Sequence, residues 1–100
     1  MTKYPKTLLT IVAEAVLEVP LLRDVRERGA QSWVVGEVHA ANLEGVREGA
    51  WEADRTIELK VLCEPAVADL IAEHVLSAYA RHYSVAMWFS QVTVLRPERY

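Results

Sequence analysis

Apolar positions along the chain follow patterns that predict four strands. Thr56–Cys63 alternates at the two-residue period of a half-buried strand, with its apolar set at Ile57, Leu59, Val61 and Cys63. Thr7–Ala15 is a nearly continuous apolar run, which predicts a strand buried on both faces. Ser32–His39 reads as another strand. The last begins at Val85, and a change of apolar phase predicts a bulge or bend near Ser90 and Gln91.

Two segments between the predicted strands carry apolar residues at helical spacing. The first opens at Pro20 and stops at Gly29, with a solvated face expected at Arg23, Asp24, Arg26, Glu27 and Arg28. The second opens at Pro65, with a buried stripe expected at Val67, Leu70, Ile71, His74, Val75 and Ala78. On this stripe, His74 is expected to be a boundary residue with satisfied hydrogen bonds.

The resulting order, βαββαβ, predicts an α+β, ferredoxin-like sandwich. Its four-stranded antiparallel sheet would carry two helices on one face, within a single domain over residues 1–100. Apolar residues on both faces of several strands exceed what two helices can cover. We therefore expect the helix-free face to be a subunit interface.

Composition narrows the classes of protein that fit this fold. The chain has 100 residues, 52% of them hydrophobic, and a net charge of -3, which favours a folded domain and argues against a nucleic-acid binder. Cys63 is the single cysteine, so no internal disulfide can form. With neither a signal peptide nor an apolar run of ~20 residues, we expect a cytoplasmic protein.

The connection between the second and third strands is much longer than such a fold needs. It runs from His39 to Arg55, whereas adjacent strands are usually joined by ~2–5 residues. Gly45 can admit a ligand close to the backbone, and the Arg47 guanidinium suits a phosphate or carboxylate. Trp51 is typical of contact hot spots. The length and these residues favour a functional loop.

Four segments, taken in order along the chain, resemble PII-like signalling proteins. They read LLTIVAE (8–14), GVREGAWEAD (45–54), AEHVL (72–76) and VTVLRP (92–97). The resemblance is closest to the carboxysome- and bicarbonate-transport-associated branch. It implies a ferredoxin-like homotrimer with three intersubunit clefts, in which the long connection is the T-loop. It also implies adenine-nucleotide ligands, with bicarbonate in some members, and inorganic-carbon transport or carboxysome-related partners.

The resemblance and the residue types together define the candidate sites. The ligand-binding candidates are Gly36, His39, Gly45, Val46, Arg47, His82, Tyr83 and Arg96. The partner-binding candidates are Trp51 and Glu52. We expect no catalytic residue, no metal ligand and no required cofactor, with ADP, AMP, ATP or bicarbonate as regulatory ligand. Gly36 is included because a glycine inside a strand admits a close ligand or backbone.

Two alternatives remain open at the level of sequence. Relatives begin this loop with more glycines, whereas here two are lost and a basic position is Glu44. Since a carboxylate repels phosphate, the chain could be a protein-docking module without nucleotide binding. The other alternative is a metal-binding trimer similar to the divalent-cation-tolerance proteins, which would require an exposed Cys63.

Overall fold

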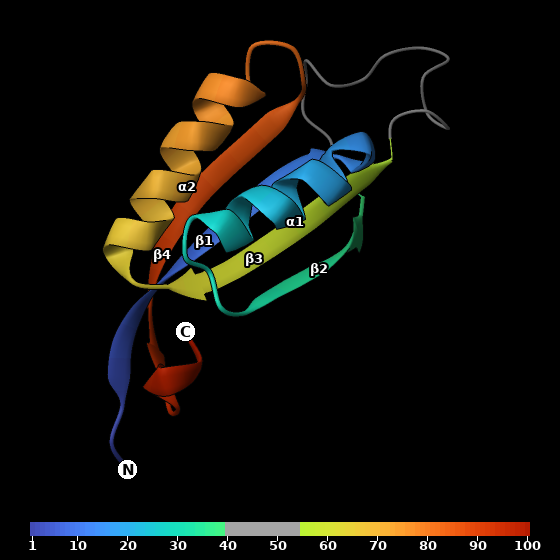
Figure 1. The fold of residues 1–100 in the computed structure, drawn as a ribbon. Helices are drawn as coiled ribbons and strands as arrows, with labels where there is room; N and C mark the ends of the chain where they lie inside the picture. Colours follow the sequence, from blue (N-terminus) through green and yellow to red (C-terminus); the bar gives the residue numbers. More distant parts are fainter. Residues whose placement is uncertain (40–54) are drawn as a thin grey trace.

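The computed structural model describes residues 1–39 and 55–100, and its elements follow the predicted order (Figure 1). The elements are β1 (Tyr4–Glu14), a 3-10 turn (Ala15–Leu17), α1 (Glu18–Glu27), β2 (Trp33–Val38), β3 (Thr56–Cys63), α2 (Pro65–Ala78), β4 (Val85–Val94) and a second 3-10 turn (Pro97–Arg99). The bounds of β3 match the expected ones. β1 starts three positions before the expected Thr7, because Tyr4, Pro5 and Lys6 pair with the end of β4.

The strands form an antiparallel sheet in the order β2-β3-β1-β4. Ile11 of β1 lies opposite Leu59 of β3 on one side and Met87 of β4 on the other. β1 and β3 are therefore the central strands, and β2 and β4 are the edges. The predicted ferredoxin-like arrangement is confirmed.

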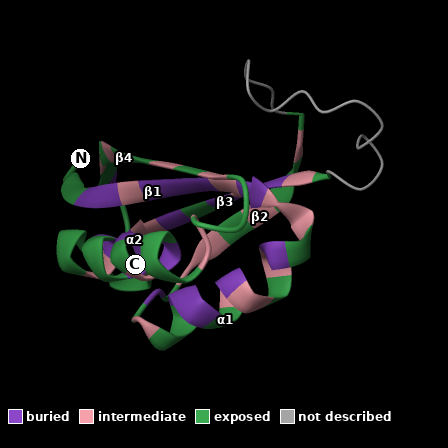
Figure 2. Cartoon of the chain, turned by 90° about the horizontal axis from the view of Figure 1, so that it is seen from above, coloured by how far each residue is buried: buried purple, intermediate pink, exposed green. Residues whose placement is uncertain are grey.

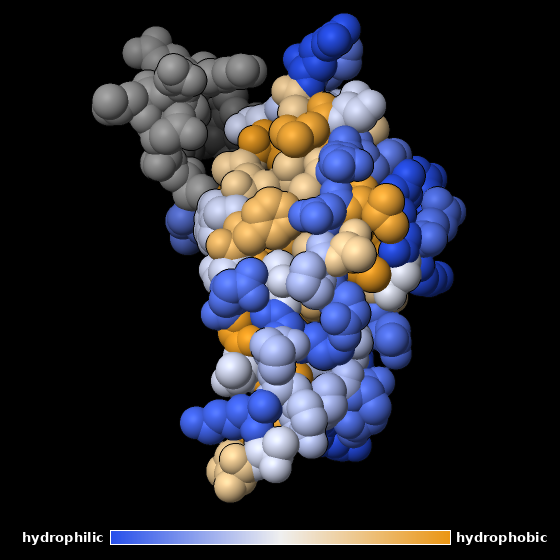
Figure 3. Space-filling model, turned by 90° about the vertical axis from the view of Figure 1, so that its left-hand side faces the viewer, coloured by the Kyte–Doolittle hydropathy of each residue, from blue (hydrophilic) through white to orange (hydrophobic). Residues whose placement is uncertain are grey.

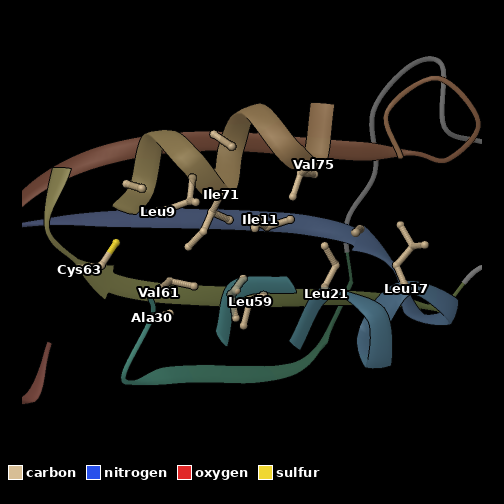
Figure 4. Packing of buried hydrophobic residues seen from close by; sticks show 14 of the residues in the cluster. Leu9, Ile11, Leu17, Leu21, Ala30, Leu59, Val61, Cys63, Ile71 and Val75 are labelled. Atoms are coloured by element: carbon tan, nitrogen blue, oxygen red, sulfur yellow. The ribbon is translucent and has the colours of Figure 1, made fainter. Parts of the chain in front are cut away.

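Both helices lie on the same face of the sheet, so the molecule has two layers (Figure 2). The buried residues lie where the layers meet. Leu9 and Ile11 of β1 pack with Leu59 of β3 and with Ile71 of α2, all of them fully buried (Figure 4). The alternation read from Thr56–Cys63 is confirmed, since Ile57, Leu59, Val61 and Cys63 all face this core.

The ends of the helices follow the local sequence. Pro65 is in the first turn of α2, where its missing N–H costs no hydrogen bond. Gly29 has φ 108 after the end of α1, a left-handed conformation that glycine adopts without strain. α1 begins at Glu18, two residues before Pro20, because a 3-10 turn leads into it from β1.

Two expectations about helix faces are wrong. Asp24, expected on the wet face of α1, is buried, because side chains of α2 and the residues after it hydrogen-bond its carboxylate. Leu70 and Ala78, both expected in the buried stripe of α2, are exposed, Leu70 by 53%. The face of α2 that contacts the core is centred on Ala68, Ile71 and Val75, which leaves Leu70 outward.

The bulge expected in β4 is absent from Val85–Val94. The register with β1 is continuous from Tyr4 opposite Val94 to Ala13 opposite Val85. Met87 packs against the helix-covered core, whereas Val92 lies opposite Lys6 on the other face. The change of apolar phase therefore marks a change in which face of the strand is covered.

No helix within residues 1–39 and 55–100 is long and apolar enough to cross a membrane.

Candidate functional site

Each of the four strands has one end on the same side of the sheet, which we call the loop edge. The name refers to these strand ends and not to the edge strands β2 and β4. β1 and β2 finish there, β3 and β4 start there, and the connection 40–54 leaves after His39 and returns at Arg55 (Figure 1). The topology therefore brings residues from four separate parts of the chain to the base of the connection singled out in the sequence.

Two contacts hold the base of this connection. The N–H of Ala15 donates to the carbonyl oxygen of Arg55 at 2.7 Å, which ties the end of β1 to the start of β3. The Arg55 guanidinium also forms an ion pair with Glu37 of β2. Both side chains of that pair are exposed, so the pair contributes only about 0–1 kcal/mol to stability. Its effect is to place a positive and a negative group together at the loop edge.

The connection from α2 to β4 forms the other side of the loop edge. It is folded as a turn in which the N–H groups of His82 and Tyr83 both donate to the carbonyl of Tyr79 at 3.0 Å. The N–H of Ser84 donates to Oε2 of Glu14 at 2.7 Å. This bond joins the end of β1 to the start of β4 and leaves the imidazole of His82 exposed.

Three of the predicted ligand residues lie at the loop edge, and their side chains are exposed: His39, His82 and Tyr83. They are not adjacent within one protomer. His39 follows edge strand β2 and His82 precedes edge strand β4, three strand spacings apart, which is roughly 14 Å. A ligand that contacts both histidines would therefore need to bridge the sheet or to lie between protomers.

Two other predicted ligand residues lie apart from this group. Gly36 is inside β2, and no other part of the described chain comes within 4 Å of where its Cβ would be. Arg96 follows the far end of β4, more than ~30 Å along the strand from the loop edge, and it pairs with Glu98. Arg96 therefore cannot join this group within one protomer.

The remaining candidates lie outside the described residues. They are Gly45, Val46, Arg47, Trp51 and Glu52.

Sequence reasoning did not find Glu14, Glu37, Arg55 and Ser84 as members of this site. One indication of them was present in the sequence, their position. Each lies at or near the end of a predicted strand, next to the connection 40–54 or to the connection between α2 and β4. Their mutual contacts depend on strand order, which alternation alone does not reveal.

The described residues bear on two other kinds of site, a metal site and a reactive thiol. Residues 1–39 and 55–100 contain no group of three His, Cys, Asp or Glu placed to hold a metal ion. Burial, with a smaller contribution from the charge of Glu64, raises the pKa of the Cys63 thiol to about 11. Cys63 is therefore a buried hydrophobe, as the sequence indicated, and not a ready thiolate ligand.

A four-stranded antiparallel sheet with two helices on one face, in the order βαββαβ, defines a ferredoxin-like α+β protein. The family model described as nitrogen regulatory protein P-II matches residues 6–99. The chain belongs to this family. The comparison with curated proteins finds no match.

Solved structures agree with this assignment. A PII-like signalling protein from Thermus thermophilus is 31% identical with a TM-score of 0.85, over 100% of this chain and 99% of that one. CPII from Thiomonas intermedia K12, solved with ADP, AMP and acetate, is 14% identical with a TM-score of 0.85, over 100% and 98% of the two chains. The same protein with ADP and bicarbonate is 16% identical with a TM-score of 0.83, over 98% and 96%.

Proposed function

We propose that this protein is a non-enzymatic PII-like regulator that senses a small anionic metabolite, an adenine nucleotide or bicarbonate. The connection 40–54 would act as its T-loop and signal to a cytoplasmic partner in inorganic-carbon transport or carbon fixation. The observation that carries the proposal is the loop edge, where exposed His39, His82 and Tyr83 lie on the same side of the sheet as the two ends of that connection. CPII, which has the same fold, binds ADP together with bicarbonate.

We further propose that the single domain, residues 1–100, assembles as a homotrimer through the helix-free face of its sheet. PII proteins are typically trimers. On that face Leu8 lies opposite Leu62, and Thr10 lies opposite Trp88, which is 48% exposed. Val34 of β2 is 69% exposed. Exposed apolar groups also interrupt the polar surface on the side of α2 and β4 (Figure 3). Assembly would remove apolar area from water.

Trimer formation is relevant to the site because the predicted residues are spread over one protomer. Arg96 lies at the end of the protomer opposite the loop edge, so it would reach a ligand only from a neighbouring subunit. His39 and His82 could likewise contact a single small ligand such as bicarbonate only if they came from neighbouring subunits. A site between subunits would bring these groups together.

Isothermal titration calorimetry with ADP, AMP, ATP, cyclic AMP and bicarbonate tests ligand sensing. We expect at least one ligand to bind and Arg47→Ala to weaken it about tenfold or more, because a guanidinium forms charge-assisted bonds to phosphate or carboxylate. Arg26→Ala, an exposed arginine on α1, is the matched control and should bind as the wild type does. Absence of binding by all five ligands would overturn the sensing proposal.

One observation favours a second candidate function, a protein-docking module without a nucleotide ligand. Two groups at the loop edge that suit an anion are already occupied by carboxylates of the chain itself. Arg55 pairs with Glu37, and the N–H of Ser84 donates to Glu14. A nucleotide retained by the purified protein would exclude this alternative.

Light scattering coupled to size-exclusion chromatography tests the assembly separately. We expect a mass near three chains for the wild type and a smaller mass for Trp88→Glu, which places a charge on the helix-free face. Leu70→Glu on the outer surface of α2 is the control and should leave the mass unchanged. A monomeric wild type would contradict the proposed trimer.

A further inference from the structure

A polar cluster connects α1 to α2 on the helix side of the molecule. The imidazole of His74 on α2 lies between two groups from the end of α1. Its Nε2 is 3.0 Å from Oδ2 of Asp24, and its Nδ1 is 2.8 Å from Nη2 of Arg28. Nη1 of Arg28 donates to the carbonyl of Asp24 at 3.1 Å, so the guanidinium bridges the two helices.

These contacts specify the protonation state of His74. A guanidinium can only donate hydrogen bonds, so Nδ1 of His74 must accept the bond from Arg28. Nε2 then carries the hydrogen and donates it to the Asp24 carboxylate. The arrangement is complete only for the neutral imidazole with its proton on Nε2, the tautomer assigned here from the hydrogen-bond network.

We propose that Asp24, His74 and Arg28 form a pH-sensitive latch between the two helices. A protonated imidazole has N–H groups on both nitrogens and no lone pair for Arg28. Protonation therefore breaks one particular bond, the one from Arg28 to Nδ1, and sets two cations against each other. The bond from Nε2 to Asp24 survives and becomes charge-assisted. The guanidinium of Arg28 is released from α2, while the two helices stay joined through Asp24.

Other charged and titratable groups surround the latch. Nε of Arg23 lies 3.5 Å from Oδ1 of Asp24, and Tyr79 donates its hydroxyl proton to Oδ2. Oε2 of Glu27 is 3.9 Å from Nη1 of Arg28, and its side chain is exposed. Glu73, next to His74 on α2, is also exposed. The buried carboxylate of Asp24 is thus shared by three donors: Arg23 of α1, His74 of α2 and Tyr79 just after α2. Nδ1 of His74, by contrast, has a single partner among the described residues, Arg28.

The released residue lies where α1 leads into β2. Two backbone bonds close this turn, from the N–H of Gly29 to the carbonyl of Arg26 at 3.2 Å and from the N–H of Ala30 to Val25 at 3.0 Å. With Arg28 bound to His74, the turn is fastened to α2 by a side chain. After release, the turn is held by its backbone bonds, which include one from the N–H of Arg28 to the carbonyl of Asp24 at 3.2 Å, and by the burial of Ala30 in the core. The latch thus acts on the entry to edge strand β2, and it does not depend on the proposed function.

Nitrogen-15 NMR of the His74 ring together with amide hydrogen exchange tests the latch on the intact protein. At pH 8 we expect a protonated Nε2 and an unprotonated Nδ1. Between pH 8 and pH 5, protection of the Gly29 and Ala30 amides, corrected for intrinsic exchange, should fall about fivefold as a proton appears on Nδ1 of His74. In Arg28→Lys, protection should already be low at pH 8 and should not change with protonation of His74.

The control is Arg26→Lys, an exposed arginine of the same helix whose guanidinium lies over the ring of Trp33. It should retain the pH dependence of the wild type. A proton on Nδ1 of His74 at pH 8 would overturn the proposal on the wild-type protein alone. Equal pH dependence of Gly29 and Ala30 protection in the wild type and Arg28→Lys would overturn it as well.

Discussion

Glu14 accepts a hydrogen bond from the backbone N–H of Ser84 at 2.7 Å, across 70 positions of sequence. The bond joins the last residue of β1 to the residue before β4 and closes the side of the loop edge next to His82. Replacing Glu14 by Ala should lower the free energy of unfolding by about 0.5–1.5 kcal/mol, because a charged acceptor is lost from an exposed bond.

Urea denaturation measures this change, with Glu73→Ala, an exposed glutamate of α2, as the control. We expect the control to change stability by less than about 0.5 kcal/mol. A Glu14→Ala protein as stable as the control would show that the bond contributes nothing in solution.

Asp24 should make stability depend on pH in the acid range. Burial raises its pKa, but hydrogen bonds from Tyr79 and His74 and the charges of His74 and Arg23 outweigh burial, so the pKa lies below its ordinary value. A lowered pKa contributes stability that is complete above the unfolded value and is lost as pH falls through the folded value. We expect Asp24→Asn to cost about 1–3 kcal/mol at neutral pH.

The difference in unfolding free energy between Asp24→Asn and the wild type should shrink between pH 4.5 and pH 2.5. Urea denaturation at several pH values in this window measures it. A difference that stays constant would contradict the lowered pKa of Asp24.

Cys63 should react slowly in the native protein. With its pKa raised to about 11 and its side chain buried, the reactive thiolate is scarce at pH 7.5. Labelling by a chromogenic disulfide should be about 100-fold or more slower than in urea, since the thiolate is the nucleophile. Ser77→Cys places an exposed thiol on α2 as the control. Rapid native labelling at Cys63 would instead support the thiolate metal site.

Leu59 and Leu70 differ in burial, since Leu59 lies in the core and Leu70 on the outer surface of α2. Leu59 is fully buried in central strand β3, so Leu59→Ala should cost about 2–5 kcal/mol in unfolding free energy. Leu70 is 53% exposed, and Leu70→Ala should cost less than about 1 kcal/mol. Denaturant unfolding measures both. Similar costs for the two substitutions would mean that Leu70 is buried in solution, for example by a partner.

The order of elements followed from the sequence because strand and helix periods are local properties. The alternation of Ile57, Leu59 and Val61 needs no knowledge of the rest of the fold, since side chains on a strand alternate between faces. Gly29 and Pro65 mark helix ends for equally local reasons of backbone geometry. The long connection was visible as well, because its length can be counted along the chain.

Contacts between distant elements were decided by the tertiary structure. Asp24 reads as a surface residue of α1 because its neighbours are charged, yet His74 and Tyr79 cover it and satisfy its carboxylate. The valines after Gln91 suggest a bulge, although the register of β4 is continuous and only the covered face changes. Glu14 meets Ser84 because strand order places β1 beside β4. Such partners depend on how the elements pack in three dimensions. Hydrophobic periodicity describes one element at a time, so it does not predict these contacts.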